Sequence, residues 1–115
     1  MAHIEMTNYE ILLECGLYQS NNPKEDYKVN STKFPFKAKN INYIFLSHAH
    51  IDHSGLIPKL FAQGCDGKII CPKGTKSLLK ILLPDSAYII SRDCEFLNKK
   101  YKMKASPYYG IYCTI

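Results

Sequence analysis

Short apolar runs alternate with polar stretches along the chain, and this alternation predicts strands separated by helices. Tyr9 to Leu17 and Ile41 to Leu46 are apolar and are followed by turn or polar residues, which is typical of buried strands. A third strand is expected over Lys68 to Cys71. Met1 to Asn8 has no clear strand pattern, and the polar stretch Gln19 to Lys33 predicts a long surface loop, with or without a helical turn.

Helical spacing follows the second and third strands. Ser54-Gly55 opens a predicted helix that runs through Ala62, so this part of the chain is expected to form a crossover unit of strand, helix and strand. From Thr75 onward apolar residues recur at helical intervals, and Pro84 either kinks this helix or begins a second one. The positions expected to pack in the core are Leu78, Leu79, Leu82, Leu83, Ala87, Ile90, Cys94 and Leu97.

Composition places the chain among globular proteins. Its 115 residues are 46% hydrophobic and 22% charged, which suits one domain or part of a larger one. The apolar runs are far shorter than the roughly 20 residues of a membrane-spanning helix, so no membrane association is expected. Glu5, Glu10 and Glu14 interrupt the region where a signal peptide would need its apolar segment.

The cysteines and lysines carry weaker signals. The 5 cysteines are odd in number and include no C-x-x-C pair, which favours a reducing cytoplasm and buried thiols; they are Cys15, Cys65, Cys71, Cys94 and Cys113. The net charge of +5 permits a polyanionic partner, but the lysines are dispersed and are more typical of a solvated surface.

Three of the 4 histidines stand within six residues, in the segment His48-Ala-His50-Ile-Asp52-His53. The chance of this pattern at the chain's own residue frequencies is roughly two in ten thousand. His48 and His50 are two residues apart in an extended segment, so their side chains lie about 6.5 Å apart on one side and can share a metal ion. The turn into the next helix directs Asp52 and His53 toward a second ion or a bridging water. His3 is isolated and is interpreted as an ordinary histidine.

This segment resembles the second motif of the metallo-β-lactamase superfamily, because a strand leads into Ser-His-Ala-His-Ile-Asp-His-Ser-Gly-Leu-Ile-Pro, residues 47 to 58. The resemblance implies an α/β fold that forms part of an αββα sandwich, with a mixed sheet and flanking helices. Residues 11 to 16 are similar to the first motif, in which an acidic residue supports the metal loop; here it is Glu14, where most members have Asp. Residues 71 to 79 and 82 to 86 are similar to the β-CASP branch, whose members cut RNA or DNA.

The resemblance implies a zinc-dependent hydrolase with two ions, with Mn²⁺ as an alternative. His48 and His50 would bind one ion, and Asp52 and His53 would help to hold the other. Asp52 would orient the attacking water and accept its proton. The expected substrate is RNA or single-stranded DNA, and a small thioester, lactam or lactone is the alternative.

The superfamily needs a third histidine, a bridging aspartate and a final histidine, and no histidine follows His53. We therefore expect residues 1–115 to be a partial metallo-β-lactamase domain, the N-terminal portion, which is inactive alone and prone to self-association or to pairing with the missing half. Asp85 and Asp93 are expected to be solvent-exposed helix residues. A non-catalytic homologue that binds a partner is the remaining alternative.

Overall fold

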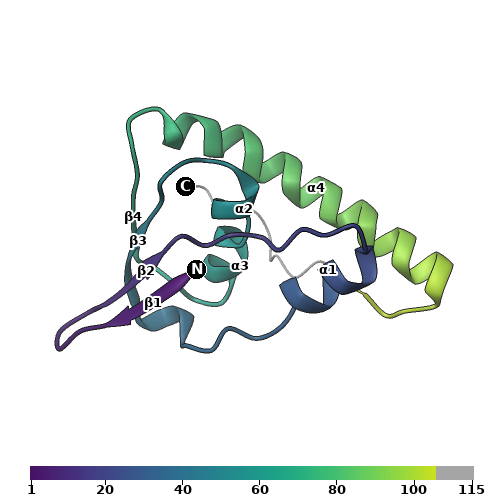
Figure 1. The fold of residues 1–115 in the computed structure, drawn as a ribbon, viewed down its shortest axis with the longest axis horizontal. Coiled ribbons are helices and arrows are strands. Elements are labelled where there is room, and N and C mark those ends of the chain that lie inside the picture. The colour runs from purple at the N-terminus through teal and green to yellow at the C-terminus, as the bar shows by residue number, and fades with distance from the viewer. Residues whose placement is uncertain (106–115) are drawn as a thin grey trace.

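The computed structural model describes residues 1–105 and contains one four-stranded sheet with helices packed on one side of it (Figure 1). The strands are β1 (Ala2–Glu5), β2 (Glu10–Leu13), β3 (Ile41–Phe45) and β4 (Lys68–Ile70), in the order β1-β2-β3-β4. β1 and β2 are antiparallel, whereas β2, β3 and β4 are parallel. The expected mixed sheet with flanking helices is confirmed.

The helices are α1 (Pro23–Asn30), α2 (Ile51–Ser54), α3 (Ile57–Ala62) and α4 (Thr75–Tyr101), and a short 3-10 helix spans Ala38–Asn40. The crossover from β3 to β4 runs through α2 and α3, as the spacing predicted. α4 then extends along the molecule as its longest element. No helix within residues 1–105 combines the length and apolarity needed to cross a bilayer.

The two faces of the sheet differ in their surroundings. Leu12 and Ile44 are fully buried and point to the face that the helices cover. Leu13, Phe45 and Ile70 alternate with them and are paired across the strands on the opposite face, where each remains exposed. An exposed apolar sheet face was expected of half a sandwich, and these residues form one.

Several sequence predictions were wrong in detail. Met1 to Asn8 does contain a strand, β1, although all four of its residues are exposed. The polar stretch after Gln19 holds the two-turn helix α1, because Asn22 accepts hydrogen bonds from the backbone amides of Lys24 and Glu25. The strand expected over Tyr9 to Leu17 covers only Glu10–Leu13.

The helices also differ from the predicted ones. The helix expected from Ser54 begins earlier, at Ile51, and is interrupted at Gly55-Leu56, so it forms two short helices. α4 continues through Pro84 as one helix. Leu79 and Leu83 are buried as expected, but Leu78 is 53% exposed. Ile90, Cys94 and Leu97 form a second buried cluster, with Ala87 packed against it.

Candidate metal centre

The histidine segment lies directly outside the carboxyl ends of the parallel strands. The backbone amide of Leu46, the residue after β3, donates to the carbonyl of Ile70 in β4 at 2.9 Å, so the strand pairing continues to this edge. The chain then passes through Ser47 to His50 and enters α2 at Ile51. Ligand sites of open parallel sheets commonly lie at this edge, because the loops that follow the strands converge there.

Three of the predicted ligands come together. Donor atoms of His48, His50 and Asp52 all lie within 4.8 Å of one another. Two donors that share a zinc ion at bonds of about 2.1 Å lie at most about 4.2 Å apart, so the observed cluster needs only a slight contraction. Two imidazoles and a carboxylate are a donor set that zinc accepts, and the residues therefore fit a metal ion.

His53 lies beside this group with different contacts. Its ring centroid is 3.9 Å from that of His48. Its Nδ1 atom is 3.2 Å from a carboxylate oxygen of Glu14, and its Nε2 atom is 3.3 Å from a carboxylate oxygen of Asp52. All four predicted ligands are thus neighbours, and their division between two ions stays a prediction.

Glu14 supports the histidine loop from the end of β2. Its Oε1 atom accepts a hydrogen bond from the backbone amide of Ser47 at 2.9 Å, while its Oε2 atom faces His53. Burial opposes ionisation of this carboxyl, but hydrogen bonds from Ser47 and the charge of His53 outweigh it, so the pKa of Glu14 lies below its usual value. The backbone φ of Glu14 is 63°, an uncommon left-handed value that ends β2 and turns the chain under the loop.

Gly16 allows the chain after β2 to approach the backbone of α2 closely. A Cβ atom at this position would lie 1.8 Å from the carbonyl oxygen of Asp52, and no side chain can occupy that space. The close approach permits three backbone hydrogen bonds between the two segments: Cys15 N to His53 O (2.8 Å), Leu17 N to Ile51 O (3.0 Å) and Leu56 N to Cys15 O (2.9 Å). These bonds fix the short helix that carries Asp52 and His53.

Ser47 orients the first histidine. A hydrogen bond of 2.7 Å joins its hydroxyl to Nδ1 of His48. The Nε2 atom of that ring is therefore left to bind a metal ion. Sequence reasoning assigned no role to Ser47, although its position next to His48 was an available signal. Ser54 stabilises the backbone of the same loop, because its buried hydroxyl donates to the carbonyls of Ala49 and His50.

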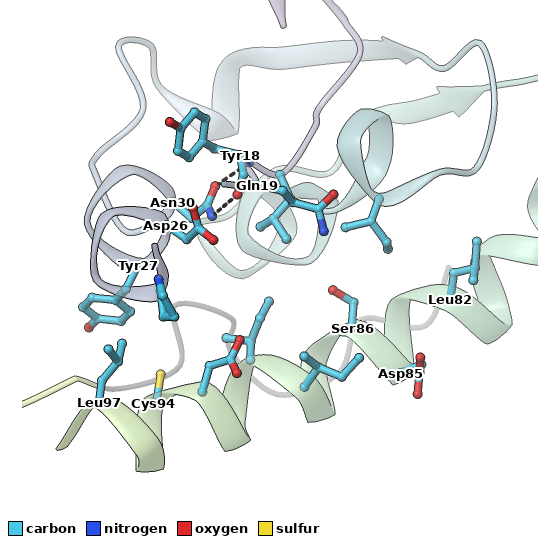
Figure 2. Close-up of a pocket in the computed structure, with 16 residues that line it drawn as sticks. Tyr18, Gln19, Asp26, Tyr27, Asn30, Leu82, Asp85, Ser86, Cys94 and Leu97 are labelled. Atoms are coloured by element: carbon cyan, nitrogen blue, oxygen red, sulfur yellow. Dashed lines mark hydrogen bonds between the residues drawn. The ribbon is translucent and has the colours of Figure 1, made fainter. Parts of the chain in front are cut away.

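A cleft of about 210 Å³ lies between α1, α4 and the beginning of α2 (Figure 2). Ile51 lines it, so the cleft borders the helix that carries Asp52. Asn30 closes one side, where its side-chain amide both accepts from the backbone amide of Tyr18 and donates to the Tyr18 carbonyl, each at 2.8 Å. Sequence reasoning missed Asn30, because no local pattern reveals a contact twelve residues distant.

Asp85 and Asp93 are exposed residues on the α4 side of this cleft, as expected, and neither belongs to the group of candidate metal ligands. Partial burial and the charge of Asp26 raise the pKa of Asp93 above its usual value. Of the cysteines, Cys15, Cys65 and Cys94 are buried, as predicted, and Cys71 is partly buried. Cys113 lies outside the described residues.

Comparison with known proteins agrees with the motif analysis. The family model described as the metallo-beta-lactamase superfamily matches residues 5–104. A ribonuclease of Thermus thermophilus is 36% identical over 80 residues, which cover 70% of this chain and 18% of that protein. Transcription termination factor FttA of Methanococcus maripaludis is 36% identical over 100 residues, which cover 82% of this chain and 14% of that protein.

A probable RNase of Methanocaldococcus jannaschii is 33% identical over 97 residues, which cover 84% of this chain and 20% of that protein. The matched part of the chain thus spans between 14% and 20% of the length of these three relatives. The likeness concerns the segment that contains β2, the histidine loop and α4, and it extends over most of the residues described above.

Proposed function

Since the chain belongs to the metallo-beta-lactamase superfamily and its named relatives to the β-CASP branch, we propose that it carries part of the metal centre of a hydrolase that cuts RNA phosphodiesters. The convergence of His48, His50 and Asp52 supports a metal-dependent hydrolase most directly. The names of the Thermus and Methanocaldococcus relatives, a ribonuclease and a probable RNase, support RNA as the substrate. The net charge of +5 is compatible with a polyanion.

The proposed cofactor is a pair of zinc ions, with Mn²⁺ as an alternative. His48 and His50 would hold one ion, while Asp52 and His53 would help to hold the other. When bound, such ions lower the pKa of water toward about 7 and offset negative charge on a phosphoryl oxygen. Asp52 orients the attacking water and takes up its proton, because it is the exposed carboxylate within the donor group.

The residues around the ligands have positioning roles in this proposal. Ser47 fixes the ring of His48 through its 2.7 Å hydrogen bond. Glu14 holds the loop through the Ser47 amide and contacts His53. Ser47 and Glu14 lie outside the group of His48, His50 and Asp52. Loss of their contacts should therefore weaken metal binding without removing a metal ligand.

We also propose that residues 1–115 are the N-terminal part of a metallo-β-lactamase domain, that the remaining ligands come from other residues of the complete domain, and that the chain alone is inactive. No histidine follows His53, and a stable zinc site takes three or four protein ligands. The odd number of cysteines supports the cytoplasm as the compartment.

A chimeric enzyme tests the nuclease function. Residues 1–115 would replace the matching segment of the Thermus ribonuclease, which supplies the rest of the domain. We expect the chimera to cleave single-stranded RNA, to lose this activity in a chelator and to regain it with Zn²⁺ or Mn²⁺. Nitrocefin and glutathione thioesters should be poor substrates, and the 115-residue chain alone should hydrolyse nothing.

Two outcomes of this experiment contradict the nuclease proposal, and a third contradicts the proposal that the chain alone is inactive. A folded, zinc-loaded chimera that hydrolyses thioesters but not RNA would favour the small-molecule hydrolase. A folded, zinc-loaded chimera that hydrolyses nothing would favour a non-catalytic binding module. Turnover by the 115-residue chain itself would show that the chain completes its own site.

The role of Asp52 is tested by Asp52→Asn in the same chimera. The amide keeps the shape of the side chain but cannot accept a proton, so kcat should fall by about 100-fold or more while KM changes little. Glu25→Gln is the control, since Glu25 is an exposed carboxylate of α1 outside the donor group. A fall in kcat shared equally by both variants would remove Asp52 from the reaction.

A further inference from the structure

The C-terminal part of α4 runs close to α1 (Figure 1). Exposed lysines and exposed aromatic rings of the two helices meet there. Lys24 of α1 places its Nζ atom 4.6 Å from the centre of the Tyr101 ring. Lys100 places its Nζ atom 5.4 Å from the ring centre of Phe96 and 5.5 Å from that of Tyr101. We call Lys24, Phe96, Lys100 and Tyr101 the lysine-aromatic patch.

The aromatic rings of the patch are accessible. Phe96 is 46% exposed and Tyr101 is 41% exposed, and their centroids lie 6.4 Å apart at an interplanar angle of 85°. Two neighbouring exposed rings offer a small apolar surface on which a ligand can pack. Both residues keep exposed surface although lysines lie over their rings, so a flat ligand can still reach them.

Glu25 and Glu95 stand beside the patch in sequence, but the two lysines of the patch form no ion pair within residues 1–105. Every ion pair formed within residues 1–105 involves a histidine, so neither Lys24 nor Lys100 has a carboxylate partner there. Glu25, the sequence neighbour of Lys24, instead accepts a hydrogen bond from the Tyr18 hydroxyl. Further exposed lysines follow at the end of α4 and just beyond it: Lys99, Lys102 and Lys104.

Unpaired cations beside exposed rings are the chemistry that binds single-stranded nucleic acid, because phosphates pair with the cations while bases stack on the rings. We propose that the lysine-aromatic patch is a second contact surface for single-stranded RNA, separate from the histidine cluster. This inference rests on the proposed function for the identity of the polyanion. The sequence had suggested only a solvated face, since Lys24 and Lys100 are 76 positions apart and meet only in the folded chain.

The location of the patch gives it a role that the metal centre cannot perform. Ile51 of α2 and Leu82 of α4 pack against the same core cluster, which does not include Leu97, and Phe96 lies roughly 20 Å beyond Leu82 along the helix axis. RNA held at the patch therefore has to extend along α4 before it reaches Asp52. The patch binds a part of the strand that is not cut, and this positions the strand and favours substrates longer than a few nucleotides.

The test is the binding of a labelled single-stranded 15-nucleotide oligouridine to the 115-residue chain, measured by fluorescence anisotropy in chelator at several salt concentrations. The Lys24→Glu/Lys100→Glu variant should weaken binding at least tenfold and reduce the slope of log K against log salt by about 1.4, which is the loss of two phosphate contacts. The matched control is Lys76→Glu/Lys80→Glu, which changes the same charge at exposed positions of the other end of α4 and should weaken binding less than threefold.

Stacking is tested separately with Tyr101→Ala, which keeps the charge and should weaken binding about tenfold. An oligonucleotide duplex should bind more weakly than the single strand. Circular dichroism confirms folding of each variant, and Lys24→Gln/Lys100→Gln replaces the charge-reversal variant if the latter does not fold.

Equal loss in the two double variants would mean that only net charge matters, and unchanged binding in Lys24→Glu/Lys100→Glu would remove the patch from the RNA surface. Binding to vesicles of anionic lipid without binding to RNA would also overturn the proposal. Zinc affinity is measured on chelator-free samples of the same proteins, so intact zinc binding with failure of the patch leaves the hydrolase proposal standing.

Discussion

At the scale of single residues, the motif predicted the ligands but not what holds them. Three histidines and an aspartate in six residues indicated a metal site without any structure, because the pattern is rare by chance. The contribution of Gly16 depends on a close approach between segments far apart in sequence, and local patterns contain no such information. Ser47 stands next to His48, so its position was an available signal that the motif analysis did not use. Glu14 was found only through the family resemblance, and its contact with the Ser47 amide agrees with that role.

Gly16 is the residue whose replacement should disturb the site most without touching a ligand. Gly16→Ala places a Cβ 1.8 Å from the Asp52 carbonyl oxygen, so α2 has to move away from Cys15 and Leu17. We expect a loss of about 3 kcal/mol or more in unfolding free energy, measured by urea denaturation. Gly74→Ala is the control, because its Cβ would meet nothing within 4 Å. Only the φ of 93° opposes this substitution, and it should lower the unfolding free energy by about 1–2 kcal/mol. Equal losses in the two variants would contradict the close-packing argument.

At the scale of elements, hydrophobic periodicity predicted β3, β4 and α4 because each has an apolar pattern of its own. It failed for α1, which has too few apolar residues for a periodic pattern and is capped by Asn22 at its start and by Lys59 at its end. The buried Nζ of Lys59 in α3 donates to the carbonyls of Asn30 and Thr32 at 2.8 and 2.5 Å, which caps the end of α1. A cation at the C-terminal end of a helix also interacts favourably with the helix dipole.

Lys59 should make the stability of the fold depend on pH. Burial lowers the pKa of its amine below 10.5, so between the folded pKa and 10.5 the unfolded chain binds more protons than the folded one. The unfolding free energy of the wild type therefore rises with pH through this window. The Lys59→Met variant has no amine at this position and lacks that rise. Lys59→Met should cost about 1–3 kcal/mol at pH 7, because two carbonyls lose their donor, and more at pH 10. Urea titrations at both pH values check this, with the exposed Lys68→Met as control; a cost independent of pH would contradict it.

At the scale of the whole molecule, the sequence predicted half of a layered fold, and the sheet has one covered and one open face. Burial of these strands was predictable from their apolar residues, but the covered face was not, because Leu12 and Ile44 each stand between apolar or aromatic neighbours. The face of α4 that packs on the core could not be predicted from its apolar pattern. Leu78 belongs to that pattern together with Leu79 and Leu83, but only Leu79 and Leu83 are buried.

The open sheet face should make the isolated chain associate. Leu13, Phe45 and Ile70 form an exposed apolar row, and such a row gains stability when a second copy or the rest of the domain covers it. Sizing chromatography should give an apparent mass above 13.2 kDa that rises with concentration. Phe45→Lys/Ile70→Lys should restore the monomer, whereas Leu78→Lys/Ile81→Lys on α4 should not. A monomer at all concentrations would contradict this prediction.

The central claim is that His48 and His50 bind a metal ion, and a zinc competition titration against a chromophoric chelator tests it most directly. If the remaining ligands lie outside residues 1–115, as proposed, the chain should bind zinc weakly, because it supplies fewer protein ligands per ion than a complete site. His48→Ala/His50→Ala should lower the affinity at least tenfold, and His3→Ala, which removes a histidine outside the cluster, should leave it unchanged. Equal zinc affinity in all three proteins would contradict the claim.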